Sequence, residues 1–124
     1  MSVTLLALYR RPEGGDEALT TFRRRYGAEH LPLIRRVPGL RSVHVARIER
    51  RLMGEDDLVL VARMIFDDRA ALDAGLASDE MRVAGRNLRE VAPGIVELFV
   101  TEPDAEMGSS AAELLGDDAG PGRA

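Results

Sequence analysis

Two short runs in this chain are apolar on both sides of an extended strand. VTLLALY covers residues 3–9 and LVLVARMIF covers residues 58–66. Each run is too short for a buried helix, so both predict strands. Alternate side chains of a strand point to opposite faces, so the first strand carries on one face Val3, Leu5, Ala7 and Tyr9, and on the other Leu6 and Leu8. A sheet built on such strands needs apolar cover on both faces.

A helical stripe lies between these two strands. Apolar residues and one histidine recur at spacings of three and four, which places on one helix face Leu19, Phe22, Tyr26, His30, Leu33 and Val37. Asp16 or Gly15 caps the start of this helix, and Pro38-Gly39 ends it. Pro32 falls inside the pattern. Because proline lacks an amide hydrogen and crowds the preceding turn, it predicts a kink or a restart of the helix.

The rest of the chain supplies two more strands and a second helical region. LRSVHVARIERRL, residues 40–52, alternates like a strand and forms a predicted hairpin with residues 58–66. Residues 67–92 predict helix with a break at Ser78, a good N-cap residue. IVELFVTE, residues 95–102, predicts the last strand. The order βαββαβ predicts an α+β fold in which two helices cover one face of a four-stranded antiparallel sheet.

The second apolar face of this sheet has no helix to cover it. An apolar patch of that size is unusual on the surface of a monomer and marks an interaction site. We therefore expect a homodimer joined sheet to sheet.

Length and charge predict one domain followed by an acidic tail. The chain has 124 residues, and the charges within residues 1–102 cancel, so that the net charge of −4 resides in the Gly-rich residues 103–124. We expect a domain over residues 1–102 and a flexible tail over residues 103–124, with one helical turn near Ala111–Leu115. The neutral body argues against a nucleic-acid surface.

Cysteine usage and the N-terminus bear on the compartment. The chain has no cysteine, which excludes disulfides, thiolate nucleophiles and cysteine metal sites, and which suits a reducing compartment. The first apolar run is too short for a membrane span and has no basic residue before it, unlike a signal peptide. We expect a cytoplasmic protein that does not contact membranes.

His30 is the main candidate for chemistry. Tyr26 precedes it by one helical turn on the same face, so the phenol and the imidazole can meet. The interruption at Pro32 opens the packing beside the ring. An imidazole in such a cleft can act as a general acid or base, with Tyr26 orienting it or donating to a substrate carbonyl. A packed structural histidine is the alternative interpretation.

The other polar residues form no recognised motif. His44 lies within a predicted strand, where it lines the same cleft or lies in the dimer interface. The two histidines, even with Glu29 or Glu49, match no metal-site spacing, so no metal is expected. No nucleotide-binding loop or serine-nucleophile motif is present. RNA-recognition modules share the βαββαβ order, but residues 58–66 lack their base-stacking aromatics.

With these elements in place, residues 8–48 resemble the EthD-like family of dimeric α+β barrel proteins. The resemblance rests on residues Arg10, Arg11, Phe22, Tyr26, His30, Leu33 and Pro38-Gly39-Leu40. The segment FDDRAALDAGLASDEMR, residues 66–82, is similar to the family's second helical segment. The family often carries an acidic residue later in this region, where this chain has Arg86-Asn87.

The resemblance implies a ferredoxin-like protomer whose sheet pairs with that of a second copy to form a dimeric α+β barrel. It also implies a small-molecule pocket between the helices and the sheet, without a cofactor. Relatives in the superfamily include cofactor-free monooxygenases, muconolactone isomerases and polyketide cyclases.

The first functional hypothesis is a cofactor-independent enzyme for an apolar, aromatic or polyketide-like carbonyl compound, acting by isomerisation, cyclisation or dehydration. In this hypothesis His30 moves a proton, Tyr26 assists it, and Phe22 and His44 line the pocket. One alternative is a non-catalytic dimeric module that binds a small apolar ligand, and another is a cofactor-free monooxygenase. In a further alternative the acidic tail, residues 103–124, contacts a partner.

Overall fold

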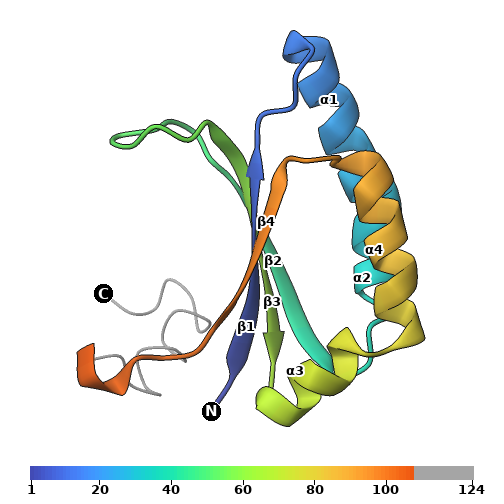
Figure 1. The fold of residues 1–124 in the computed structure, drawn as a ribbon, viewed down its shortest axis with the longest axis vertical. Coiled ribbons are helices and arrows are strands. Elements are labelled where there is room, and N and C mark those ends of the chain that lie inside the picture. The colour runs from blue at the N-terminus through green and yellow to red at the C-terminus, as the bar shows by residue number, and fades with distance from the viewer. Residues whose placement is uncertain (108–124) are drawn as a thin grey trace, which may run out of the picture.

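A computed structural model describes residues 1–107 as one antiparallel sheet with helices on one side (Figure 1). The strands are β1 (Val3–Arg10), β2 (Leu40–Arg47), β3 (Leu58–Phe66) and β4 (Val96–Thr101). They lie in the order β2-β3-β1-β4, and each neighbouring pair is antiparallel. The predicted α+β class, the βαββαβ order and the hairpin are confirmed. The turn predicted at residues 111–115 falls outside the described residues.

The two runs that are apolar on both faces form the two central strands of the sheet. In β1, side chains alternate between buried and partly exposed along the whole strand. The register places Leu5 opposite Met64 of β3 on the face that packs against the helices. It places Leu6 opposite Phe99 of β4 on the other face. A central strand has a neighbour on each edge, so on both faces its side chains are flanked by those of two other strands.

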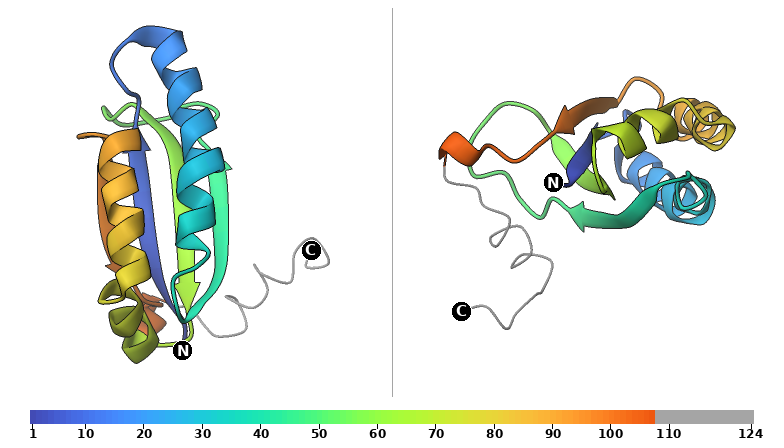
Figure 2. Two further views of the ribbon diagram at one scale, coloured as in Figure 1. Left: turned by 90° about the vertical axis from the view of Figure 1, so that its right-hand side faces the viewer. Right: turned by 90° about the horizontal axis from the view of Figure 1, so that it is seen from below.

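The helices cover a single face of the sheet (Figure 2). They are α1 (Gly15–Arg25), the π-helical segment η1 (Tyr26–His30), α2 (Leu31–Ile34), α3 (Arg69–Leu76) and α4 (Asp79–Val91). α1 has two acidic residues in its first turn and three arginines in its last, an arrangement that complements the helix dipole. α4 begins where predicted, since the Ser78 hydroxyl accepts a hydrogen bond from the Met81 amide at 3.1 Å.

The interruption predicted at Pro32 takes the form of a π-helical turn. The amide of Leu31 donates to the carbonyl of Tyr26, five residues earlier, instead of four. The chain then resumes as α2 with Pro32 in its first turn, where a missing amide hydrogen removes no helical hydrogen bond. Tyr26 and His30 therefore lie within the wide turn itself.

β2 is shorter than predicted, because it ends at Arg47 and not at residue 52. Its partner β3 begins at Leu58, and just beyond the end of β2 the amide of Ile48 donates a hydrogen bond to the carbonyl of Val59 in β3. The residues beyond Ile48 have no strand beside them. They form a long connection that extends to the side of the sheet without helices, as does the segment after β4 with its short helix η2 (Ala105–Met107) (Figure 1).

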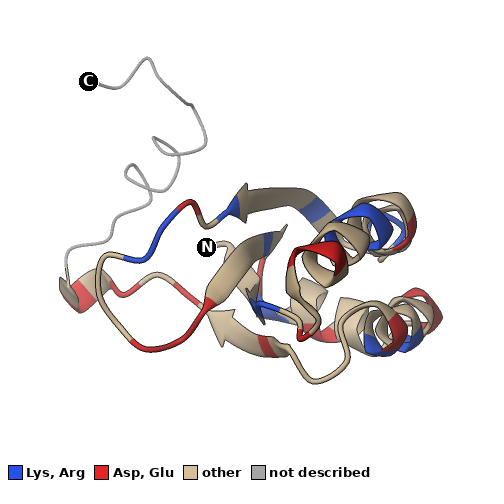
Figure 3. Ribbon diagram, turned by 90° about the horizontal axis from the view of Figure 1, so that it is seen from above, with Lys and Arg blue, Asp and Glu red and all other residues tan. Residues whose placement is uncertain are grey.

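The face of the sheet opposite the helices, here called the open face, carries an apolar cluster on β1, β3 and β4, with polar side chains such as Arg63, Glu97 and His44 beside it. The register brings together on it Leu6, Leu8, Val61, Ile65 and Phe99, of which Phe99 is 46% exposed. Acidic and basic residues gather on the helices and the connecting loops, whereas most of the strand surface is uncharged (Figure 3). This is the uncovered apolar face that the sequence predicts. Within residues 1–107, no helix has the length and hydropathy needed to cross a membrane.

Candidate functional site

An apolar cavity of about 170 Å³ lies between the helices and the sheet, and His30 forms part of its wall. We call it the His30 cavity. The other lining residues are Leu5, Tyr9, Ile34, Met64, Leu76, Met81, Ala84, Gly85, Leu88 and Leu98. They come from β1, α2, β3, α3, α4 and β4, so that, with His30 of η1, all elements around the cavity except α1 and β2 contribute to its lining. An apolar cavity with few polar groups is typical of small-molecule sites.

A chain of hydrogen bonds connects His30 to the protein surface. His30 Nδ1 and Asn87 Oδ1 lie 3.2 Å apart, and Asn87 Nδ2 donates to Glu29 Oε1 at 3.1 Å. Arg25 holds the same carboxylate with two bonds, from Nε to Oε2 at 2.8 Å and from Nη2 to Oε1 at 3.0 Å. Such bidentate arginine–carboxylate pairs fix geometry well. α4 and the α1–η1 helix are thus joined by polar contacts directly behind the imidazole.

This chain of bonds assigns the proton on the imidazole. Because the Asn87 amide nitrogen donates to Glu29, its oxygen is the atom that accepts from His30, and Nδ1 therefore carries the hydrogen. Burial lowers the pKa of the His30 imidazole, and the hydrogen bond with Asn87 opposes part of this effect. At neutral pH the ring is uncharged, and Nε2 is the nitrogen left with a lone pair for a molecule in the cavity.

Tyr26 and His30 do come together, as rings in contact. Their centroids lie 5.2 Å apart, and Tyr26 also meets Tyr9 edge to face at 4.9 Å. Tyr26 does not line the His30 cavity, whereas Tyr9 does. Burial raises the pKa of both phenols, so both are protonated at neutral pH, and a hydrogen bond between the two hydroxyls raises the pKa of Tyr9 further and lowers that of Tyr26.

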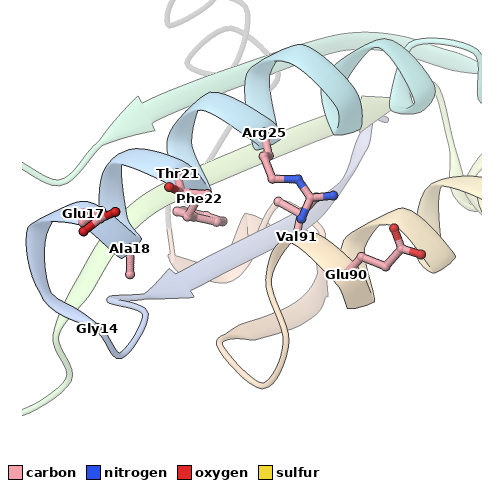
Figure 4. Close-up of a pocket in the computed structure, with 8 residues that line it drawn as sticks. All are labelled: Gly14, Glu17, Ala18, Thr21, Phe22, Arg25, Glu90 and Val91. Atoms are coloured by element: carbon pink, nitrogen blue, oxygen red, sulfur yellow. The ribbon is translucent and has the colours of Figure 1, made fainter.

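Phe22 lies in a different place from the one the sequence suggests. It is buried against Tyr9 and Tyr26, and it lines a separate open hollow between α1 and α4 rather than the His30 cavity (Figure 4). Arg25 crosses from α1 toward α4 at this hollow (Figure 4). Phe22 thus packs against the rings of Tyr9 and Tyr26 and does not line the His30 cavity.

His44 lies on the open face, away from His30. The register pairs it with Arg63 of β3, whose side chain shares that face, and its Nε2 lies 3.2 Å from the Ser42 hydroxyl. Of the two positions open from the sequence, the structure places His44 on the face expected for a dimer interface. The two histidines are therefore separated by the sheet. Within residues 1–107, no three His, Asp or Glu side chains lie together in a way that can hold a metal ion.

Asn87 and Glu29 are site residues that the sequence did not single out for this role. The stripe of α4 contains Ala84, Leu88 and Val91, and Asn87 follows Ala84 by one turn on the edge of that stripe. Asparagine is a poor residue for a helix interior, because its side chain competes for backbone hydrogen bonds. An asparagine beside an apolar stripe within a helix is the feature of the sequence that could have marked Asn87 as a site residue. This feature does not reveal that Asn87 meets a residue 57 positions away.

Several known structures are similar to this chain. An EthD family protein from Bacillus halodurans C-125 is 34% identical over 84% of this chain and 100% of its own, with a TM-score of 0.74. A dimeric ferredoxin-like protein of unknown function from Jannaschia sp. CCS1 is 20% identical over 82% of this chain and 99% of its own, with a TM-score of 0.59.

A third similar structure is a variant of SnoaB, a cofactor-independent oxygenase from Streptomyces nogalater. It is 17% identical over 89% of this chain and 96% of its own, with a TM-score of 0.56. No protein-family model and no curated protein matches the chain.

These likenesses carry different weight. The Jannaschia and Streptomyces structures establish the fold, which is ferredoxin-like as the resemblance implied. The Bacillus halodurans protein is aligned over its whole length at 34% identity. The chain belongs to the ethyl tert-butyl ether D (EthD) family.

Proposed function

We propose that this chain is a cofactor-independent enzyme that transfers a proton on an apolar carbonyl compound of aromatic or polyketide-like type. The observation that carries this proposal is the neutral, buried His30 imidazole in the wall of an apolar cavity. The hydrogen bond between Asn87 and Nδ1 leaves Nε2 as the base. The apolar surroundings keep the imidazole uncharged at neutral pH, so that Nε2 is available to accept a proton.

The two tyrosines have separate roles in this proposal. Tyr9 lines the cavity with His30, and its hydroxyl exchanges the hydrogen bond with Tyr26 for one to the substrate carbonyl, where negative charge develops as the proton leaves. Tyr26 packs against the imidazole and orients it. Nε2 takes the proton from the carbon next to the carbonyl and returns it to the enolate at another atom, which leaves the enzyme unchanged. Return of the proton at another atom completes an isomerisation. Cyclisation and dehydration begin with the same removal of a proton and continue from the enolate by different steps.

Hydrogen exchange of a simple ketone tests the proposal without knowledge of the natural substrate. Acetophenone is incubated with the protein in D2O at neutral pH, and replacement of its methyl protons is followed by NMR. We expect the wild-type protein to accelerate the exchange and His30→Gln to lose about 10²–10⁴-fold of that acceleration.

The matched control for this experiment is the second histidine. His44→Gln makes the same chemical change on the other side of the sheet, and we expect it to keep the exchange rate of the wild type. Equal exchange by the wild-type protein and His30→Gln would show that His30 is not the base.

Two other functions remain as candidates, and each has its own observation. A binding module without catalysis is favoured by how apolar the His30 cavity is, and it predicts ligand binding with no exchange. A cofactor-free oxygenase is favoured by the shared fold with SnoaB, and it predicts oxygen consumption when an oxidisable aromatic substrate is added. An oxygen electrode distinguishes the oxygenase from the proton-transfer enzyme.

We further propose that two copies pair through the open face. Similar structures from Jannaschia sp. CCS1 and Bacteroides fragilis NCTC 9343 are described as dimeric with a ferredoxin-like fold. In this chain, the β2–β3 connection extends past that face and carries the exposed side chains of Leu52 and Met53. These residues are placed to contact a second copy and to add to the apolar area that pairing buries.

A further inference from the structure

A second apolar space adjoins the His30 cavity at the edge of the sheet. This space, here called the α4–β4 groove, has a volume of about 470 Å³ and runs between the end of α4 and strand β4. Gly85, Leu88 and Leu98 line both spaces. A molecule seated against His30 therefore has a second apolar space directly across these three residues.

We propose that the cavity and the groove form one binding site for a carbonyl compound with an unbranched apolar tail, and that Gly85 is the residue that admits the tail. The proposal rests on the proposed function only for the assignment of the carbonyl end to the cavity.

The volumes indicate that the cavity alone is too small for a substrate of the expected class. Pockets that bury a ligand of ordinary size measure roughly 300–1,000 Å³, and the His30 cavity has about 170 Å³. That space accommodates a ring or a short chain. Together with the groove, the site reaches the usual range, so the rest of the molecule lies along α4 and β4.

The lining of the groove indicates what kind of tail it takes. Its apolar residues are aliphatic or small: Leu88, Ala92, Pro93, Val96 and Leu98. Of the described residues that line the groove, Arg89 alone is charged and none is aromatic. Leu98 is 52% exposed, so a tail lying on it removes apolar surface from water. An alkyl chain fits this lining better than a flat ring system, which would find nothing to stack on.

Neighbouring atoms do not require a glycine at position 85, so we attribute its presence to the space that it leaves between the cavity and the groove. It lies in the middle of α4, where glycine is among the least favourable residues. No heavy atom outside its own helical surroundings lies within 4 Å of the position that a Cβ would occupy. The backbone there has ordinary helical torsion angles, since Gly85 is not among the glycines with positive φ. The missing side chain instead leaves open the junction between the cavity and the groove.

A series of alkyl phenyl ketones tests the proposal by binding alone. Acetophenone, butyrophenone and octanophenone share one head group and differ in tail length, and their affinities are measured by equilibrium dialysis. We expect each added methylene to tighten binding to the wild-type protein about three- to fourfold until the groove is filled. In Gly85→Leu, the new side chain occupies the junction, and we expect octanophenone to lose about tenfold or more while acetophenone keeps its affinity.

Arg86→Leu is the matched control, because it places the same new side chain on α4 at an exposed position that lines neither the cavity nor the groove. We expect it to bind octanophenone like the wild type, and thermal unfolding confirms that both variants are folded. A wild-type affinity that does not depend on tail length overturns the proposal and is the result expected if a second copy covers the groove. Equal tail dependence in Gly85→Leu, or loss of acetophenone binding there, also overturns it. None of these results depends on exchange at His30, so the proposed function fails or stands separately.

Discussion

At the scale of single residues, the site depends on how one imidazole is held. Asn87 is itself held by Glu29, and Glu29 by Arg25, so the orientation of His30 depends on a surface ion pair. The ion pair is partly exposed and contributes little to stability by itself. Its effect is to fix the amide of Asn87 in one orientation, and that orientation selects the tautomer of His30.

The first prediction concerns the amide of Asn87. Asn87→Asp replaces a neutral acceptor by an anion beside Nδ1, which favours the protonated imidazole and raises the pKa of His30. In the wild-type protein the pKa lies below its ordinary value. NMR titration of the imidazole signals measures both values. The neighbouring Arg86→Gln, at an exposed position, is expected to leave the titration unchanged. A titration of His30 that is the same in Asn87→Asp and the wild type would contradict the hydrogen-bond assignment.

The second prediction follows from the same pKa by linkage. The unfolded chain binds a proton at His30 near pH 6.5, whereas the folded protein does so only at lower pH, because burial lowers the folded pKa. The stabilisation is thus fully present above about pH 6.5 and is lost as the pH falls toward the folded pKa, by at most about 1.4 kcal/mol per pH unit. Urea unfolding between about pH 5 and 7 measures the slope.

The comparison with variants isolates the contribution of His30 to this slope. His30→Gln removes the titrating group, and we expect its unfolding free energy to change less with pH in this range. His44→Gln is expected to keep the slope of the wild type. A slope that survives in His30→Gln would assign the pH dependence to other groups.

At the scale of the elements, two helical glycines make opposite predictions. In α3, a Cβ on Gly75 would lie 2.8 Å from the ring of Phe66 and 3.1 Å from the carbonyl oxygen of Pro38. Phe66 is fully buried and has no room to move, so Gly75→Ala is expected to destabilise the fold by about 1–3 kcal/mol. In α4, Gly85→Ala meets open space and is expected to stabilise by up to about 1 kcal/mol.

Urea unfolding of the two variants checks this pair directly. Each variant is the control for the other, because both make the same change within a helix. Stabilisation by Gly75→Ala would show that α3 does not pack against β3 as closely as described.

Helix periodicity explains why some features of the elements could be predicted from the sequence and others could not. The common face of Tyr26 and His30 depends on residues one turn apart, and the interruption depends on Pro32 alone. The π-helical form of that interruption was not predicted, because it arises from which carbonyl the Leu31 amide reaches. The contact between His30 and Asn87 joins two helices, and periodicity contains no information about how they lie relative to each other.

At the scale of the whole molecule, the sheet was the most predictable part. Apolar residues on both faces of β1 and β3 require central positions, and the observed strand order gives them those positions. The face taken by His44 was less predictable, because β2 is an edge strand on which neither set of alternate residues is clearly apolar. Its alternation is therefore too weak to show which side chains point to the helices.

The last prediction concerns how the open face is covered. Leu6 lies on β1 with Arg63 of β3 and Phe99 of β4 on either side. We expect the wild-type protein to be a dimer at micromolar concentration in analytical ultracentrifugation. Leu6→Arg places a second cation beside Arg63 in the middle of the proposed interface, where desolvation and like-charge repulsion both oppose pairing, and we expect a monomer.

Val83→Arg is the matched control for this experiment. Val83 is 40% exposed on α4, on the other side of the molecule, and we expect its replacement to leave the dimer intact. A monomeric wild-type protein would contradict sheet-to-sheet pairing and leave the apolar open face without an explanation. A Leu6→Arg protein that is still dimeric would move the interface to another surface. Because the His30 cavity lies on the helix side of the sheet, a folded Leu6→Arg monomer is also expected to retain acetophenone binding.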